Sequence, residues 1–370
     1  MEVVEDRRVR VLCFQDDGFR STMEDAHSVA ACAGGNVSLI GVYDGHGGDQ
    51  VARFCAGSMS TILDCNQAFR DGNYARSLHQ VFMEADSRAP GADCCGSTAT
   101  VALVTDDGQV FLGNVGDSYC CLFVDGYVMD ISQEHDCKCP GELDRVVKAG
   151  GYVERGSKGR ITLAGKEDDV DSLMVTRSIG DWSFKSNPQL SREEQAVSAV
   201  PDIVNFEISK GCHFLILASD GVDKNSIDDY HCGQIQKALQ ARDYEQLKQV
   251  VYKILASLKN DNQTLLLVEL KAATKQQFGK STTGVASPRD THQQEMRSQP
   301  SSWTPAMPGG NARSTIIAGA RTNAAVDSPS LAARRPRRHR GIQRGDRGRD
   351  QETRGRLHEA PDCQDQTIGI

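Results

Sequence analysis

Apolar and β-branched residues gather in short runs of strand length throughout the first 270 residues. Seven such runs are bounded by turn-forming residues, and this pattern predicts β-strands. They begin at Val9, Val37, Thr98, Gln109, Tyr119, Cys212 and Gln263.

Two Asp-Gly pairs connect neighbouring predicted strands. Asp107-Gly108 and Asp125-Gly126 each lead straight from one apolar run into the next. Asp-Gly readily adopts the positive φ angles of a tight hairpin, so we expect these strands to pair antiparallel.

Apolar residues recur at helical spacing in three segments between the strands. These segments run from Val51 to Ile62, from Leu78 to Ala85 and from Leu247 to Leu258. Asp243 precedes the third, with Gln246 three residues later, which is an N-cap arrangement. Helices interspersed among hairpin strands predict an α+β fold.

The periodic pattern stops near residue 270. Residues 271–370 are rich in Gly, Pro, Ser, Gln and Arg, and they contain too little apolar surface to offset their ordering entropy. We therefore expect one domain at 1–270 and a disordered tail at 271–370. The tail holds 17 Lys and Arg against 9 Asp and Glu, whereas the domain holds 25 against 41. An acidic domain disfavours nucleic acid as its main partner and suits bound cations.

The sequence predicts no membrane segment. No apolar run approaches the ~20 residues that span a bilayer, and the start MEVVEDRRVR is too charged for a signal peptide. The 13 cysteines are odd in number and include the adjacent pairs Cys94-Cys95 and Cys120-Cys121, which predicts reduced thiols. We expect a monomer in the cytosol or nucleus.

Three predicted strands are followed by an acidic residue. These residues are Asp44, which precedes Gly45, then Asp117, and Asp220, which precedes Gly221. A carboxylate that leaves the end of a buried strand faces a cleft, and an adjacent glycine can offer its carbonyl. Such oxygen ligands suit Mg²⁺ or Mn²⁺. Any one of these acids is explained as well by a turn or a strand cap, but the set favours a metal site.

Ten short motifs are distributed over the first 270 residues. In chain order they are RSTMED from Arg20, VYDGHGG from Val42, GSTA from Gly96, GNVGDS from Gly113, EHDCK from Glu134, ELDRVVKAGGYV from Glu142, LMVTRSIGD from Leu173, VPDI from Val200, ASDG from Ala218 and NDNQT from Asn260. In this order they resemble the motifs of the metal-dependent protein phosphatases of the type 2C class, the PPM family. The resemblance implies a sandwich of two mainly antiparallel β-sheets flanked by α-helices, with a metal cleft at one end.

The resemblance also implies metal ligands. Asp44 corresponds to a carboxylate that bridges two Mg²⁺ or Mn²⁺ ions, and the Gly45 carbonyl to a further ligand. Asp220 and Asp261 correspond to the remaining ligands of one ion.

Further acidic residues have implied roles around these ions. Glu24 and Asp25 correspond to residues that hold metal-bound waters. Asp117, together with Asp220, resembles the pair that binds a weaker third ion in some members.

The chemistry of phosphate ester hydrolysis agrees with these roles. Two adjacent cations neutralise the phosphate dianion and lower the pKa of a bridging water. Arg20 offers a planar fork to two phosphate oxygens, and His46 is placed to protonate the departing serine or threonine oxygen. The predicted function is hydrolysis of phosphoserine and phosphothreonine, and the expected partners are phosphorylated proteins.

The chain departs from the family pattern at three places. Val222, Asp223 and Lys224 stand where a tryptophan and then an aspartate are common. Tyr119 replaces a common arginine, and an acidic insertion spans 166–171. None removes an implied ligand, so we expect effects on local packing and substrate preference.

Two other segments have the spacing of phosphate-binding motifs. Cys139 and Arg145 have the C-x5-R spacing of cysteine-dependent phosphatases, but Glu142 and Asp144 between them would repel phosphate. The segment 151–158 (GYVERGSK) resembles a P-loop but lacks its GK[ST] ending.

Three further hypotheses remain open. Cys137 and Cys139 have the spacing of a metal-binding pair, but no second CxC or His pair lies near enough in the sequence to complete a site, so reduced structural cysteines are the better explanation. A pseudophosphatase would bind phosphoproteins without turnover, but such proteins usually lose a metal carboxylate. The tail segment RRPRRHRG from Arg334 favours contacts with acidic partners or nucleic acid, and a solvated extension explains it equally well.

Overall fold

The computed structural model describes residues 1–32, 35–92, 95–153, 159–163 and 172–271. The predicted tail lies outside these residues except for Lys271, so its disorder and the boundary near residue 270 remain predictions. The acidic insertion and most of the GYVERGSK segment also lie outside them.

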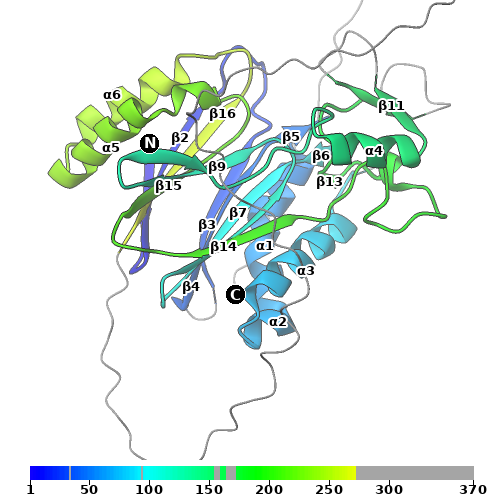
Figure 1. Ribbon diagram of the computed structural model, residues 1–370, viewed down its shortest axis with the longest axis horizontal. Coiled ribbons are helices and arrows are strands. Elements are labelled where there is room, and N and C mark those ends of the chain that lie inside the picture. Colours follow the sequence, from blue (N-terminus) through cyan, green and yellow to red (C-terminus); the bar gives the residue numbers. More distant parts are fainter. Residues whose placement is uncertain (33–34, 93–94, 154–158, 164–171, 272–370) are drawn as a thin grey trace, which may run out of the picture. The chain divides into compact units, whose positions relative to one another are not determined.

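Two antiparallel sheets form the centre of the domain (Figure 1). The six-stranded sheet consists, in spatial order, of β1 (Glu2–Glu5), β2 (Val9–Asp16), β16 (Gln263–Leu270), β15 (Cys212–Ala218), β9 (Tyr119–Val124) and β10 (Tyr127–Asp130). The five-stranded sheet consists of β14 (Asp202–Glu207), β8 (Gln109–Val115), β7 (Ala99–Thr105), β4 (Val37–Tyr43) and β3 (Ala26–Cys32). All seven predicted strands are confirmed, and so is β10, the run that the Asp125-Gly126 turn leads into; β1, β3 and β14 were not predicted.

Both predicted hairpins are present. Asp125-Gly126 joins β9 to β10 with φ angles of 50° and 91°, and Val124 pairs with Tyr127 across this two-residue turn. At Asp107-Gly108, between β7 and β8, only the glycine has a positive φ, because that loop is longer.

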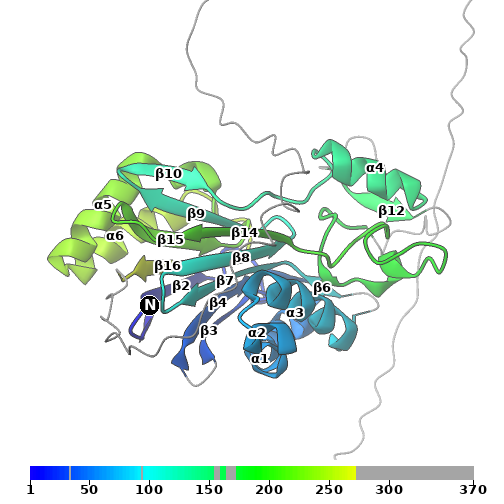
Figure 2. The same ribbon diagram turned by 60° about the horizontal axis from the view of Figure 1, so that its bottom comes forward.

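Helices cover the outer face of each sheet (Figures 1 and 2). The five-stranded sheet carries α1 (Gln50–Cys65), α2 (Gln67–Arg70) and α3 (Tyr74–Arg88), and the six-stranded sheet carries α5 (Asp229–Ala241) and α6 (Tyr244–Leu255). The predicted helical segments 51–62 and 78–85 lie within α1 and α3. The expected sandwich of two antiparallel sheets flanked by helices is therefore confirmed.

The predicted third helix is α6, but it is shorter than expected. The Asp243 side chain accepts a hydrogen bond from the Gln246 N–H, so the predicted N-cap is present. The helix ends at Leu255, and Leu258 lies beyond it with 36% of its surface exposed. The Ser257 N–H bonds to the Ile254 carbonyl, three residues back, which tightens and closes the last turn.

Alternating side chains along the strands build three apolar layers. On β2, Val11 and Cys13 face the opposite sheet, whereas Leu12 and Phe14 pack with residues of α5 and α6. Full burial of a large apolar side chain contributes about 1.5–3 kcal/mol to stability, so these layers hold the two sheets and their helices together.

A smaller group of elements lies at one end of the sandwich (Figures 1 and 2). Its strands and helices are α4 (Pro140–Lys148), β11 (Gly151–Val153), β12 (Ile161–Leu163) and the three-stranded sheet β13 (Ile179–Gly180), β6 (Gly96–Ser97) and β5 (Gly45–His46). The 3₁₀ turns Trp182–Lys185 and Lys224–Ser226 follow β13 and β15 in sequence. Val146, Ile161, Phe184 and Val197 form a separate small core here.

The described cysteines number 11, and no disulfide joins any two of them, in agreement with the predicted reduced thiols. No helix within the described ranges combines the length and apolar character that crossing a membrane requires.

Candidate active site

The predicted metal ligands lie where connections leave the strands, and all contribute to one end of the sandwich. They are Glu24 and Asp25 before β3, Asp44 directly after β4, Gly45 in β5, Asp117 after β8, Asp220 after β15 and Asp261 before β16. Residues separated by more than 200 positions in sequence are thus brought together, because both sheets direct these connections to the same end.

The carboxylates at this end of the fold repel one another. Burial raises the pKa of Asp44 well above its ordinary value, and the charges of Asp25, Asp220 and Asp117 raise it further. Burial together with Asp220 raises the pKa of Asp117 to about 7.

Asp25 shows the same effect and carries an unpartnered atom. Burial raises its pKa to about 6, against the effect of its bond from Ser219 and with added repulsion from Asp220 and Asp261. The Ser219 hydroxyl donates to Asp25 Oδ2 at 2.8 Å, but the buried Oδ1 has no hydrogen-bond partner among the described residues. A buried oxygen without a partner calls for an ion or a water.

The donor set fits a hard divalent cation, because it consists of mutually repelling carboxylate oxygens and a glycine carbonyl. Within the described residues, no three His, Cys, Asp or Glu side chains already form a set of metal ligands. Repulsion between neighbouring carboxylates opposes their closing around one point until a cation balances the charge.

Two motifs of the sequence hold the Asp44 backbone. The Asp44 N–H donates to Thr98 Oγ1 at 3.0 Å, and the Thr98 N–H donates to the Asp44 carbonyl at 2.9 Å. The Thr98 hydroxyl also bonds to that of Ser118, at 2.7 Å. The GSTA and GNVGDS segments therefore fix the position of the predicted bridging residue.

Asn262 holds the connection that carries Glu24, and the sequence analysis assigned it no role. Its side-chain oxygen accepts from the Glu24 N–H at 2.9 Å, and its Nδ2 donates to the carbonyls of Thr22 and Asp17 at 2.9 and 3.1 Å. Asn262 was visible only as a member of the NDNQT motif.

Arg20 lies beside a predicted ligand. Its Nη2 donates to Asp261 Oδ2 at 2.7 Å and its Nε to the Asn260 carbonyl at 3.2 Å. The side chain is 56% exposed, so it can still contact phosphate oxygens from the solvent side.

His46 pairs with Asp181, a residue that the sequence analysis missed. The Nε2 atom of His46 lies 2.8 and 3.0 Å from the two Asp181 carboxylate oxygens. Burial lowers the pKa of His46, but the Asp181 charge and hydrogen bond more than offset this and raise it overall. Asp181 ends the LMVTRSIGD motif, which was its one signal in the sequence.

Gly96 gives the His46–Asp181 pair its space. A Cβ at this position would lie 2.1 Å from Asp181 Oδ2 and 2.5 Å from His46 Nε2. Any other residue would push the two side chains apart, which explains the glycine of the GSTA motif.

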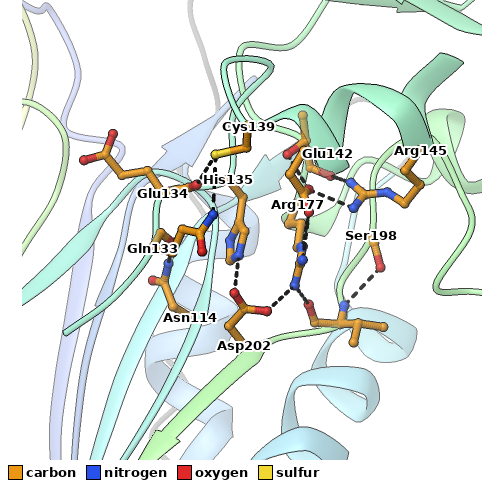
Figure 3. A network of polar contacts seen from close by, with 12 residues as sticks. Asn114, Gln133, Glu134, His135, Cys139, Glu142, Arg145, Arg177, Ser198 and Asp202 are labelled. Atoms are coloured by element: carbon orange, nitrogen blue, oxygen red, sulfur yellow. Dashed lines mark hydrogen bonds and ion pairs between the residues drawn. The ribbon is translucent and has the colours of Figure 1, made fainter. Parts of the chain in front are cut away.

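A charged network joins α4 to β14 (Figure 3). Arg177 donates to Glu142 Oε1 at 2.7 Å and to Asp202 Oδ1 at 2.8 Å. The other Asp202 oxygen lies 3.1 Å from Nε2 of the buried His135. Two members of the network are connected to site residues. The His135 N–H donates to the carbonyl of Gly116, which precedes Asp117, and Arg177 lies four residues before Asp181.

The cysteine-phosphatase hypothesis has no support in this geometry. The residues after Cys139 form helix α4 rather than a phosphate-binding loop. Arg145 pairs with Glu142 at 2.7 Å, and Cys139 Sγ donates to the Glu134 carbonyl.

Two departures from the family pattern contact each other. The Tyr119 hydroxyl donates to the Val222 carbonyl at 2.8 Å, and Lys224 Nζ lies 5.4 Å from the centre of the Tyr119 ring. Lys224 also pairs with Glu134 and Asp130, at 3.1 and 3.2 Å. The unusual residues therefore form one local cluster beside the site.

Comparison with known proteins agrees with this geometry. The sequence model of the family described as Protein phosphatase 2C matches residues 10–263. The chain belongs to the protein phosphatase 2C family. The resemblance given by the ten motifs is thereby confirmed over nearly the whole domain.

Two yeast phosphatase 2C proteins are among its relatives. "Protein phosphatase 2C homolog 2" of Schizosaccharomyces pombe is 35% identical over 216 residues, which cover 55% of this chain and 55% of that protein. "Protein phosphatase 2C homolog 2" of Saccharomyces cerevisiae is 33% identical over 234 residues, covering 58% and 48%. The chain thus spans about half the length of these relatives.

Solved structures share the phosphatase 2C fold. A serine-threonine phosphatase 2C from Toxoplasma gondii superposes with a TM-score of 0.64 at 19% identity, covering 73% of this chain and 97% of the other. A C. elegans sex determining protein superposes with a TM-score of 0.60 at 20% identity, covering 72% and 65%. At these identities the comparison shows the fold alone.

Proposed function

We propose that the protein is a metal-dependent phosphatase that hydrolyses phosphoserine and phosphothreonine in other proteins. The observation that carries this proposal is the cluster of repelling carboxylates, with the partnerless Asp25 Oδ1, at one end of a phosphatase 2C domain.

The proposed metal centre takes two Mg²⁺ or Mn²⁺ ions. Asp44, the Gly45 carbonyl, Asp220 and Asp261 would hold them directly, and Asp117 together with Asp220 would hold a weaker third ion. Glu24 and Asp25 would contact the ions through water. When bound, the ions would neutralise the phosphate dianion and lower the pKa of the attacking water.

The proton for the leaving oxygen comes from His46 in this proposal. Asp181 occupies Nε2, so Nδ1 is the ring nitrogen left to face the substrate. Because the pKa of His46 is raised, the ring keeps its proton up to a higher pH than a free histidine does. Serine and threonine alkoxides are poor leaving groups and need this proton.

Arg20 orients the substrate. Its exposed guanidinium offers two parallel donors to the phosphate oxygens, and its bond to Asp261 keeps this fork next to the metal ligands.

The test is hydrolysis of a phosphothreonine peptide by the full chain. Activity should vanish in EDTA and return with excess Mn²⁺ or Mg²⁺. Full activity of a protein shown to be metal-free would refute the proposal.

Asp44→Asn is the matched variant for this test. It removes one charge from the repelling cluster, so the metal-free protein should be as stable as the wild type or slightly more stable. The rise in thermal midpoint on adding Mn²⁺ should shrink sharply, and turnover should fall by orders of magnitude. A variant that still binds two ions and turns over normally would show that the site is assigned wrongly.

The pseudophosphatase alternative has no observation in its favour, since the chain keeps every carboxylate of the proposed site and all of them lie on connections at the same end of the fold. Phosphorylated proteins as substrates, and the cytosol or nucleus as compartment, belong to the same proposal. The described cysteines, no two of which are joined by a disulfide, support that compartment.

A further inference from the structure

Phe19 is the most exposed large apolar side chain in the described part of the chain, at 81%. A single exposed apolar residue is ordinary on a protein surface. The setting of Phe19 is what distinguishes it, because it lies directly before Arg20.

The turn that carries Phe19 is tied to the loop before β16. The Phe19 N–H donates to the Lys259 carbonyl at 2.8 Å. The Asn262 side chain donates to the Asp17 carbonyl at 3.1 Å, and Arg20 Nε donates to the Asn260 carbonyl. These hydrogen bonds join the two segments.

Gly18 lets this turn lie against the loop. Its φ is +60°, and a Cβ here would lie 2.3 Å from the Asp261 carbonyl oxygen and 2.8 Å from that of Lys259. Its N–H donates to Asp16 Oδ1 at 2.9 Å, and Lys259 Nζ pairs with Asp16 Oδ2. The backbone at Phe19 is thus held in one conformation, and a contact made by its ring costs little further ordering of the chain.

Phe19 is the immediate neighbour of a residue that is proposed to bind the phosphate. Arg20 is the next residue, and its guanidinium bonds to Asp261, a proposed metal ligand. An extended chain advances about 3.3–3.6 Å per residue, so a substrate side chain within about three residues of the phosphorylated one can reach Phe19.

We propose that Phe19 determines specificity by contacting an apolar substrate side chain that flanks the phosphorylated serine or threonine. This inference rests on the proposed function. The burial of apolar area between the ring and the substrate side chain provides the selectivity.

The experiment compares two phosphothreonine peptides with the full chain and Mn²⁺. One peptide carries leucine at the two positions on each side of the phosphothreonine, and the other carries glycine there. We expect the wild type to favour the leucine peptide about five- to tenfold in kcat/KM, mainly through KM, because the contact forms equally in the ground and transition states. Phe19→Ala should bring the ratio close to one, and Phe19→Leu should keep part of it.

Tyr230→Ala is the control, since Tyr230 is also an exposed aromatic residue, at 69%, but lies on α5. It should leave the ratio unchanged. A wild-type ratio near one would overturn the inference while leaving the proposed function intact. Equal losses on both peptides in Phe19→Ala, with the ratio kept, would show a structural role and also overturn it. If the wild type hydrolyses neither peptide, the proposed function fails, and this inference fails with it.

Discussion

At the scale of single residues, the surroundings of His46 set its protonation and orientation. Asp181 is 2% exposed, and its backbone N–H donates to the Cys95 carbonyl at 2.9 Å. The His46 charge and hydrogen bond lower the pKa of Asp181 against the effect of its burial, so it stays ionised. A fixed, ionised carboxylate of this kind both orients the imidazole and favours its protonated form.

Asp181→Asn should slow hydrolysis of phosphoserine and phosphothreonine peptides by about 10- to 100-fold, because the proton donor loses part of its orientation and basicity. An activated aryl phosphate needs no proton for its leaving group and should be hydrolysed with a much smaller loss. The measurement is kcat on both substrates.

His46→Gln provides the comparison for this variant. If Asp181 acts through His46, the double variant should be no slower than His46→Gln alone. Losses that multiply in the double variant would show that Asp181 acts by another route.

At the scale of elements, the position of α4 depends on charge as well as on its small apolar core. Glu142 is 8% exposed and accepts from Arg177, Arg145 and the Thr176 hydroxyl. Burial alone would raise its pKa, but these partners lower it to about 2. A carboxylate whose ionised form is so strongly favoured stabilises the fold at every pH at which it is charged.

Glu142→Gln should lower the free energy of unfolding at pH 7 by about 3–5 kcal/mol, because the largely buried Arg145 loses its counter-charge and Arg177 keeps only that of Asp202. The folded pKa lies below the ordinary value of 4.5. The wild-type advantage should therefore be complete above about pH 4.5 and be lost as the pH falls towards 2.

Urea unfolding in EDTA at several pH values between 7 and 3.5 measures this difference. Glu245→Gln on α6, where the side chain is 78% exposed, should change stability little at any of them. If the difference in free energy of unfolding between the wild type and Glu142→Gln stays constant down to pH 3.5, the charge of Glu142 does not have the proposed role.

At the scale of the whole molecule, charge divides the chain into an acidic domain and a basic remainder. The last described residue still belongs to the domain, since the Lys271 N–H donates to the Arg8 carbonyl at 2.8 Å and its Nζ pairs with Glu5. A cut after Lys271 therefore keeps every described contact.

Truncation after Lys271 should leave kcat and KM for a small phosphopeptide nearly unchanged. It should weaken binding to a polyglutamate probe, and the lost binding should be the salt-sensitive part, because exposed charges are screened by salt. A truncated protein that is well folded but has lost peptide hydrolysis would place the domain boundary elsewhere.

The sequence by itself determined the elements whose burial leaves a periodic pattern. Seven strands could be predicted because both faces of each sheet are covered, which requires apolar runs. Local chemistry likewise determined the hairpins and the Asp243 N-cap. Helix α5 gave a weaker signal, since small residues such as Cys232 and Ala238 form part of its buried face.

Tertiary structure alone decided which residues meet. The motifs identified Asp44, Asp220 and Asp261 one by one. The repulsion between the carboxylates, and the burial of Asp25 Oδ1 without a hydrogen-bond partner among the described residues, exist only after both sheets bring their connections to one end. The pairing of His46 with Asp181 joins residues 135 positions apart, and no spacing rule links them. The spacing of apolar residues shows which face of a strand or helix is buried. A catalytic contact, in contrast, depends on where the whole fold places segments that are distant in sequence.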